Sequence, residues 1–360
     1  MTNRDGIRIE LGSIMRELEA NGFDEVRVEF APDSHVAGEV IAGVARQGLV
    51  AANNAADKTA PDSAWGSFLT ASFAGVSVKI GSLWSDGALV RWLDAFAGEL
   101  RAGGLSGELR ATETIRLPDW VRQIAEPMMT AYVALSAPGD AGAAGWAERA
   151  ARWAAEAGGD AYVSSAGMSQ LDTTGDVAAH LAWTLRVASS GSLLYADAQA
   201  SRAAIVEIER DGQATYQTHD TSATLEDRTG RARAAVLAEA EHAHYAFMAP
   251  TPRRAYGWDA RGRALPPLRP EVPATALSVD AHLWNRFVPD VHCMQLLTDE
   301  HLAKVSDLSR WTVTPVAPGR TLVEAPDLAE WLRTGGPAPS VLDRARADFG
   351  RVLVSADDLR

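Results

Sequence analysis

The chain has 360 residues, of which 47% are hydrophobic and 22% charged, and its net charge is −13. This composition supports a sizeable core and excludes wholesale disorder, and the length fits two compact domains or one large one. The acidic charge argues against nucleic acid as a partner, because phosphate backbones are attracted to positive surfaces.

Residue usage indicates where the protein works. Only three of the 34 basic residues are lysine, and with abundant Ala and Gly this bias is typical of a GC-rich bacterial genome. Cys293 is the single cysteine, so no intrachain disulfide can form and a reducing compartment is the simplest interpretation. The first residues carry no apolar signal segment, and no apolar run reaches the roughly 18 residues of a membrane span. We therefore expect a bacterial cytoplasmic protein with no membrane partner.

The N-terminal segment predicts a helix, a strand and a second helix. Apolar residues at helical spacing lie on one face of residues 11–18, and Asn21-Gly22 supplies a left-handed stop. Residues 25–30 alternate between charged and apolar, which is the pattern of a half-buried strand. A second helix is expected over 36–54.

Two strand–helix–strand units are the clearest elements of the sequence. The first spans 76–113 and the second 129–166, and their helices end at the glycine pairs Gly103-Gly104 and Gly158-Gly159. Their similar order suggests an internal duplication. The alternative is that any right-handed βαβ unit shows this pattern.

The middle of the chain mixes strands with helices. A helix is expected over 176–188 and two or three strands over 192–217, with Asp211-Gly212 as a hairpin signal. Helical spacing of apolar residues then predicts a long helix over 226–247. Strand-rich and helix-rich stretches in one region favour mixed α+β layers over a doubly wound sheet.

Residues 249–274 carry six prolines and five arginines, and they predict a semi-rigid connector or an exposed arm. This connector places a domain boundary between 1–248 and a C-terminal module at 275–360. The module is expected to contain only short elements: a helix over 299–308, a hairpin of 311–316 and 320–324, helices over 327–332 and 340–350, and a strand at 351–355.

Together these elements predict an α+β protein of twisted mixed sheets with helices on one face. The halves are expected to be duplicated ferredoxin-like arrangements, in which a βαβ unit is split by another strand, followed by the smaller C-terminal α/β module.

The sequence offers no complete phosphate loop, nucleophile elbow or metalloprotease helix. Gly139, Gly142 and Gly145 follow a strand and open a helix, but their spacing is GxxGxxG and no acidic residue ends the next strand. Each missing element removes a contact that a dinucleotide needs, so no cofactor is predicted.

Glu239, His242 and His244 are the candidate catalytic residues, all on the helix predicted over 226–247. Glu239 and His242 are three apart, so both can face one side of a helix and act as acid–base or metal groups. Zinc would need three or four converging ligands, so no metal is predicted. The alternative is a partly buried structural histidine.

His292 and Cys293 are adjacent. Neighbouring residues of a strand point to opposite faces, so these two cannot pair with each other for catalysis. A catalytic Cys293 would need a distant histidine such as His242 or His301, and a buried cysteine is the simpler interpretation.

Residues 154–227 contain eleven acidic residues against three arginines. If these acids share one face, they would attract a basic protein partner and speed the encounter. Tryptophans on non-regular segments are further interface candidates. The candidate binding residues are Asp172, Asp176, Asp197, Glu207, Glu209, Asp211, Trp120 and Trp258. The alternative is a solvated rim.

Three functional hypotheses follow. The first, which is not enzymatic, is a protein-binding module, such as an immunity-type inhibitor or an accessory factor, that engages a basic protein through an acidic surface. The second is a hydrolase or metal-dependent enzyme with a diffuse site formed by His242, His244 and Glu239. The third is a structural component of a larger assembly, docked through 249–274. The sequence does not define the oligomeric state.

Overall fold

The computed structural model confirms the α+β class and contains two sheets. It describes residues 3–4, 6–34, 36–56, 64–72, 75–81, 86–112, 128–136, 140–165, 168–172, 175–188, 190–197, 201–209, 212–251, 283–333, 336–355 and 358. Two compact units divide the chain. Unit 1 comprises 1–116 and 163–191, and unit 2 comprises 117–162 and 192–360.

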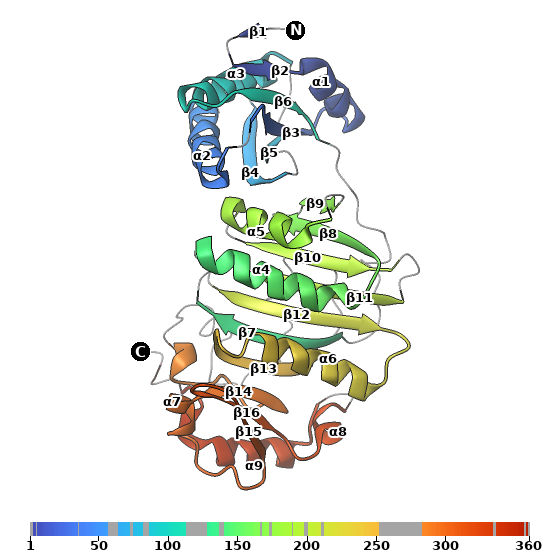
Figure 1. Cartoon of the computed structure of the whole chain (residues 1–360), viewed down its shortest axis with the longest axis vertical. Helices are drawn as coiled ribbons and strands as arrows, with labels where there is room; N and C mark the ends of the chain where they lie inside the picture. The colour runs from blue at the N-terminus through green and yellow to red at the C-terminus, as the bar shows by residue number, and fades with distance from the viewer. Residues whose placement is uncertain are drawn as a thin grey trace. The chain divides into compact units, whose positions relative to one another are not determined.

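Unit 1 is built on a six-stranded sheet with the strand order β1-β2-β6-β3-β5-β4 (Figure 1). Its strands are β1 (Asn3–Arg4), β2 (Ile7–Ile9), β3 (Glu25–Pro32), β4 (Trp65–Ala71), β5 (Val76–Gly81) and β6 (Gly107–Ala111). Its helices are α1 (Leu11–Ala20), α2 (Gly38–Ala55), α3 (Asp86–Ala102) and α5 (Val177–Ala188). Strand β3 is antiparallel to both β5 and β6, so β5, α3 and β6 form a split βαβ unit around it.

The core of unit 1 lies between this sheet and its helices α1, α2 and α3. Trp92 and Phe96 of α3 stack in it, with ring centroids 5.0 Å apart. Asn53 of α2 is buried, and its side-chain amide bonds Gly66 as a neighbouring strand would. Its Nδ2 donates to Gly66 O, and its Oδ1 accepts from the Gly66 N–H, each at 2.8 Å. The Trp92 indole N–H also donates to Asn53 Oδ1 at 2.8 Å. These contacts fix the register of β4 against the helix layer.

Helix α5 belongs to unit 1 because of Trp183. The indole N–H of Trp183 donates to Gly75 O at 2.9 Å. A Cβ at Gly38, the first residue of α2, would overlap the Trp183 ring, so the ring needs a glycine there. Arg46 of α2 donates to the backbone oxygens of Arg186 and Val187 near the end of α5.

The second sheet, formed mostly by unit 2, has the order β15-β16-β14-β13-β7-β12-β11-β10-β8-β9. Its strands are β7 (Met128–Leu135), β8 (Asp160–Ser165), β9 (Met168–Leu171), β10 (Gly191–Ala196), β11 (Arg202–Ile208), β12 (Gln213–Asp220), β13 (Ala243–Thr251), β14 (Met294–Thr298), β15 (Thr312–Ala317) and β16 (Arg320–Glu324). Helices α4 (Asp140–Ala155) and α6 (Leu225–Ala238) lie on one face of it (Figure 1). Trp146 and Trp153 of α4 meet Tyr216 of β12 edge-on.

The predicted helix over 226–247 is wrong in its second half. Helix α6 ends at Ala238, Glu239 is its C-cap, and β13 begins at Ala243. Strand β13 lies between β7 and β14, so it pairs on both sides with segments distant in the sequence. A short apolar run fits a buried helix or a central strand equally well, and only those pairings decide between them.

The two predicted strand–helix–strand units occupy different places. Strands β5 and β6 flank one strand, whereas β7 and β8 have β12, β11 and β10 between them. The predicted internal duplication of the two strand–helix–strand units is therefore not confirmed. Each sheet does contain four adjacent strands with the same arrangement: β6-β3-β5-β4 and β13-β7-β12-β11. When the strands of each set are numbered along the chain, their order across the sheet is 4-1-3-2. In the second set, the segment from β8 to β10 is inserted after α4, and a ferredoxin-like duplication stays a prediction.

The C-terminal elements lie in unit 2. They are η4 (Leu283–Asn285), α7 (Asp299–Leu302), α8 (Leu328–Trp331), α9 (Pro339–Phe349) and η5 (Gly350–Val352). The predicted hairpin exists as β15 and β16, but the strand predicted at 351–355 is a 3₁₀ turn, followed by a single bridge from Leu353 to Val288. The compact units differ from the predicted domains 1–248 and 275–360, since β13 and β14 pair across the intervening connector. Most of that connector, 252–274, lies outside the described residues.

Candidate functional site

The ends of β7 and β13 bring a serine and a histidine together in unit 2. Leu135 at the end of β7 pairs with Ala243 at the start of β13, and Ser136 follows directly. The pairing shifts by one residue between Ala243 and Tyr245, so His244 is the extra residue of a β-bulge. A bulge leaves its extra residue outside the ladder and redirects its side chain.

The two side chains are joined by a hydrogen bond of 2.9 Å between Ser136 Oγ and His244 Nε2. Ser136 is exposed and His244 is partly buried. Burial lowers the pKa of His244 below its ordinary 6.5, a hydrogen bond that the ring donates to the Asn285 side chain opposes this decrease, and the charge of Arg320 adds to it. The imidazole is therefore neutral at pH 7, and a neutral ring can accept the hydroxyl proton.

A guanidinium is fixed next to this pair. Arg320, the first residue of β16, donates from Nε to Ala243 O at 2.7 Å and from Nη1 to Gly319 O at 3.0 Å. Its charge thus lies beside the peptide group that joins Ala243 to His244. We call the following four residues the Ser136 site: Ser136, His244, Asn285 and Arg320.

The Ser136 site combines a hydroxyl, a base and a third polar group, which are three of the parts that nucleophilic catalysis uses. A serine hydroxyl is weakly nucleophilic until an adjacent base takes its proton, and the base works best when a third group orients it. In this cluster the hydroxyl is exposed, the base is neutral His244, and Asn285 is the third group. Such an arrangement can form and break an acyl–oxygen bond.

The structure does not bring Glu239, His242 and His244 together, because they leave the predicted helix and have different partners. Glu239 is fully buried, and accepts from Tyr216 Oη at 2.5 Å and Arg149 Nε at 3.0 Å. Burial, and then the charge of Glu239, raise the pKa of the Tyr216 hydroxyl. His242 is exposed in the turn between α6 and β13. Across the described residues, no three His, Cys, Asp or Glu side chains are placed to hold a metal ion.

The other conspicuous histidines and the cysteine are buried. Cys293 donates from Sγ to Met248 O at 3.5 Å, and burial raises its pKa to about 12, so the thiol stays protonated. Burial lowers the pKa of His292 and of His301 to about 4 each. His292 stacks on Phe247, and His301 Nδ1 accepts from the backbone N–H of Thr298 at 3.1 Å. These side chains are thus engaged in packing and hydrogen bonds of the protein interior.

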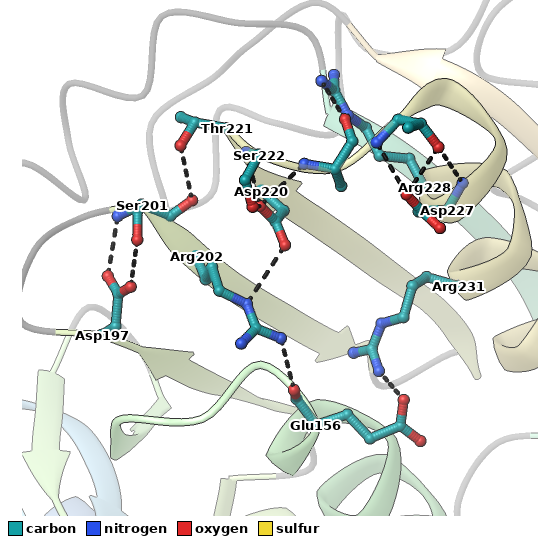
Figure 2. A network of polar contacts seen from close by, with 12 residues as sticks. Glu156, Asp197, Ser201, Arg202, Asp220, Thr221, Ser222, Asp227, Arg228 and Arg231 are labelled. Atoms are coloured by element: carbon teal, nitrogen blue, oxygen red, sulfur yellow. Dashed lines mark hydrogen bonds and ion pairs between the residues drawn. The ribbon is translucent and has the colours of Figure 1, made fainter.

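The acidic side chains near the start of β11 are engaged within the chain (Figure 2). Arg202, the first residue of β11, forms an ion pair with Asp220, with 3.3 Å between Nε and Oδ2. Its Nη2 donates to the backbone oxygen of Glu156 at 3.0 Å. Arg231 of α6 pairs with the Glu156 carboxylate. Asp197 accepts from the backbone N–H of Ser201 at 2.9 Å.

Other acids of the network close turns. Asp220 accepts from the backbone N–H of Ser222 at 2.8 Å, and Asp227 forms a capping box with Thr224 at the start of α6. These bonds favour the charged carboxylates, and they lower the pKa of Asp227 against the opposing effect of burial. Part of the chain's negative charge is thus used for local structure.

The remaining predicted binding acids lie elsewhere. Glu207 and Glu209 are toward the opposite end of β11 from Arg202, and a strand of seven residues spans roughly 20 Å. Asp172 and Asp176 belong to unit 1, where the Asp172 carboxylate is buried 3.4 Å from His180 Nδ1.

Burial lowers the pKa of His180, and the charge of Asp172 opposes that change.

The other three candidates, Asp211, Trp120 and Trp258, lie outside the described residues.

Ser136, Asn285 and Arg320 were not among the residues that the sequence suggested. One available signal was the position of Ser136 at the end of a strand, ahead of a glycine-containing loop and a helix, where nucleophiles often lie. No signal for Asn285 or Arg320 exists in the sequence, since Asn285 approaches His244 through the packing of η4 on β13, and Arg320 through the pairing of β13, β14 and β16.

No family model, curated protein or solved structure matches this chain. Among the helices of the described residues, none is long and apolar enough to cross a membrane.

Proposed function

We propose that the protein is a hydrolase in which Ser136 is the nucleophile and His244 the general base. The observation that supports this most is the 2.9 Å hydrogen bond between an exposed serine and a histidine that a β-bulge removes from the strand ladder. Bulges are over-represented next to active sites, because they redirect a side chain without ending the strand.

The reaction is acyl transfer to water. Ser136 Oγ attacks the acyl carbon of an ester, His244 Nε2 takes the hydroxyl proton, and the C–O bond to the leaving alcohol breaks as that alcohol receives the proton. Water then attacks the acyl-enzyme, His244 takes a proton from the water, and Ser136 Oγ leaves with that proton. The net change is ester plus water to acid plus alcohol, and no other reactant is needed.

A fluorophosphonate probe tests the nucleophile directly, because it labels only an activated serine. The expected result is one adduct on the intact chain, mapped by mass spectrometry to Ser136. Ser136→Ala should abolish labelling, and His244→Asn should slow it about 10²–10⁴-fold, the usual contribution of a general base. Labelling at other residues, or equal rates in His244→Asn, would exclude the proposal.

Matched controls separate the pair from its surroundings. Ser309 is an exposed serine of unit 2 whose hydroxyl donates to Asp307 instead of an imidazole. His242 is an exposed histidine two positions from His244. Ser309→Ala and His242→Asn should both keep the wild-type labelling rate.

The pH profile of labelling is a further test. His244 must be neutral to act as a base, and its pKa lies below the ordinary 6.5. The labelling rate should therefore fall to half of its maximal value only at a pH below 6.5. A profile that falls by half above pH 6.5 would contradict the assignment of His244.

A basic protein partner is the second proposal, carried over from the charge of the chain. It is favoured by Glu207 and Glu209, which are partly exposed and two positions apart, so they lie on the same side of the β11 segment. Retention of a basic protein at low salt by the wild type, lost in Glu207→Lys/Glu209→Lys, would support it. Equal retention by both chains would count against it. Docking into an assembly through 249–274 stays a prediction.

A further inference from the structure

A fixed positive charge is the part of the Ser136 site that acyl transfer alone does not require. The Arg320 guanidinium is held by two backbone oxygens, Ala243 O and Gly319 O, rather than by a carboxylate. It is close enough to His244 for its charge to lower the pKa of the imidazole. Within the described part of the chain, no ion pair neutralises Arg320 at salt-bridge distance.

The position of Arg320 is set by the fold. Gly319 is in the left-handed region, with φ of 66°, so the turn between β15 and β16 is tight and Arg320 starts the strand at once. Arg320 lies opposite Thr298, where β14 ends, and its side chain reaches past that end to Ala243. The guanidinium therefore has little freedom to move away from His244.

One carboxylate is near this turn. A Cβ on Gly319 would lie 3.4 Å from Asp299 Oδ2, so Asp299 shares the surroundings of Arg320 without bonding to it. Asp299 is exposed, and water screens its charge. The uncompensated charge of Arg320 thus outweighs it at the peptide group beside His244.

We propose that the Ser136 site acts on esters whose acyl group carries a carboxylate or another negative charge, and that Arg320 binds this charge. This inference rests on the proposed hydrolase function. Arginine suits the role because its guanidinium is always charged and can donate two parallel hydrogen bonds to a carboxylate. The free donors of Arg320 are those that Ala243 and Gly319 do not use.

A pair of chromogenic esters tests the inference on the full chain. Mono-p-nitrophenyl adipate carries a carboxylate at the far end of its acyl group, too far along the chain to cleave its own ester readily, and p-nitrophenyl heptanoate has an acyl chain of similar length without charge. The wild type should show a higher kcat/KM for the adipate ester. Arg320→Gln should lower the ratio of the two kcat/KM values about tenfold, the effect of one lost charge-assisted contact.

The ratio separates recognition from positioning. If Arg320 only holds the backbone near His244, Arg320→Gln will slow both esters equally and leave the ratio unchanged, which would overturn the inference. Arg320→Lys keeps the charge and should retain part of the preference, which guards against a folding defect in the glutamine variant. Asp299→Asn removes a charge that water screens, so it should leave the ratio within about twofold of the wild-type value.

Failure of the inference and failure of the proposed function give different results. Hydrolysis of both esters that Ser136→Ala abolishes, with a ratio near one in the wild type, keeps the hydrolase and overturns the role of Arg320. No hydrolysis of either ester, together with no fluorophosphonate label on Ser136, overturns both.

Discussion

Glu239 and His244 are five positions apart, yet the structure uses them in opposite ways. Glu239 closes α6 and is sealed in the core, with its carboxylate bonded to Tyr216 and Arg149. His244 is the second residue of the next strand, where it forms a bulge, and it shares a hydrogen bond with an exposed serine. One polar group therefore holds elements together, and the other is available for chemistry.

Burial and the set of bonded partners, rather than residue type, therefore decide the role of an ionisable side chain. A buried carboxylate with two fixed partners has no proton or ligand to exchange with solvent. A neutral imidazole can accept a proton, and its exposed hydroxyl partner can meet a ligand from solvent. Substitutions at the buried groups should therefore change stability alone, while those at Ser136 and His244 should change reactivity alone.

The largest effect on stability is expected from Glu239→Ala. This substitution leaves the Arg149 guanidinium and the Tyr216 hydroxyl without their partner, and breaking a buried pair in this way costs about 3–5 kcal/mol. Urea unfolding should show this loss, while fluorophosphonate labelling of the remaining folded protein should be unchanged.

Glu241→Ala is the matched control, since Glu241 lies two positions on and is exposed. Its free energy of unfolding should differ from that of the wild type by less than about 0.5 kcal/mol, as is usual for exposed sites. A Glu239→Ala protein of normal stability but slow labelling would reverse the roles that the comparison assigns.

Much of the fold could be predicted from local patterns. The α+β class is confirmed, and α1, α3 and the β15–β16 hairpin appear where helical spacing and turn residues indicated them. The strand after Ala238 could not be predicted, because residues 243–249 (AHYAFMA) form a strand only by pairing with β7 and β14 on either side. Local periodicity carries no information about such distant pairing.

The next largest effect concerns the buried histidines and pH. His292 and His301 have pKa values of about 4 in the folded protein against an ordinary 6.5, so below pH 6.5 the unfolded chain binds more protons. Stability from each histidine is complete above pH 6.5 and is lost as the pH falls toward 4. A difference of this size corresponds to about 3 kcal/mol per histidine.

His292→Phe keeps a ring to stack on Phe247 and removes one titrating group. Urea unfolding at pH 7 and pH 4.5 should show a smaller loss of stability in the variant than in the wild type. Comparing the two chains cancels the carboxylates that also titrate near pH 4. Equal losses of stability would mean that burial does not lower the pKa of His292.

The Ser136 site was only partly visible in the sequence. His244 was a candidate, but for the wrong reason, since it was expected on a helix with Glu239 and His242. Its partner Ser136 precedes it by 108 positions, and Asn285 and Arg320 follow it from two further elements. Four residues from four segments give no spacing pattern, so only the sheet order and the packing of η4 on β13 bring them together.

The smallest effect is expected in the exposed network of Figure 2, between Arg202 and Asp220. Asp220→Asn removes one charge but keeps an oxygen that can accept from Ser222, so it isolates the ion pair from the turn. Exposed pairs contribute about 0–1 kcal/mol, and salt weakens them further. The free energy of unfolding should fall by less than about 1 kcal/mol at low salt and by less still at 0.5 M salt. A loss as large as that of Glu239→Ala, unaffected by salt, would show that this network is sealed like Glu239, and the contrast between buried and exposed polar groups would then fail.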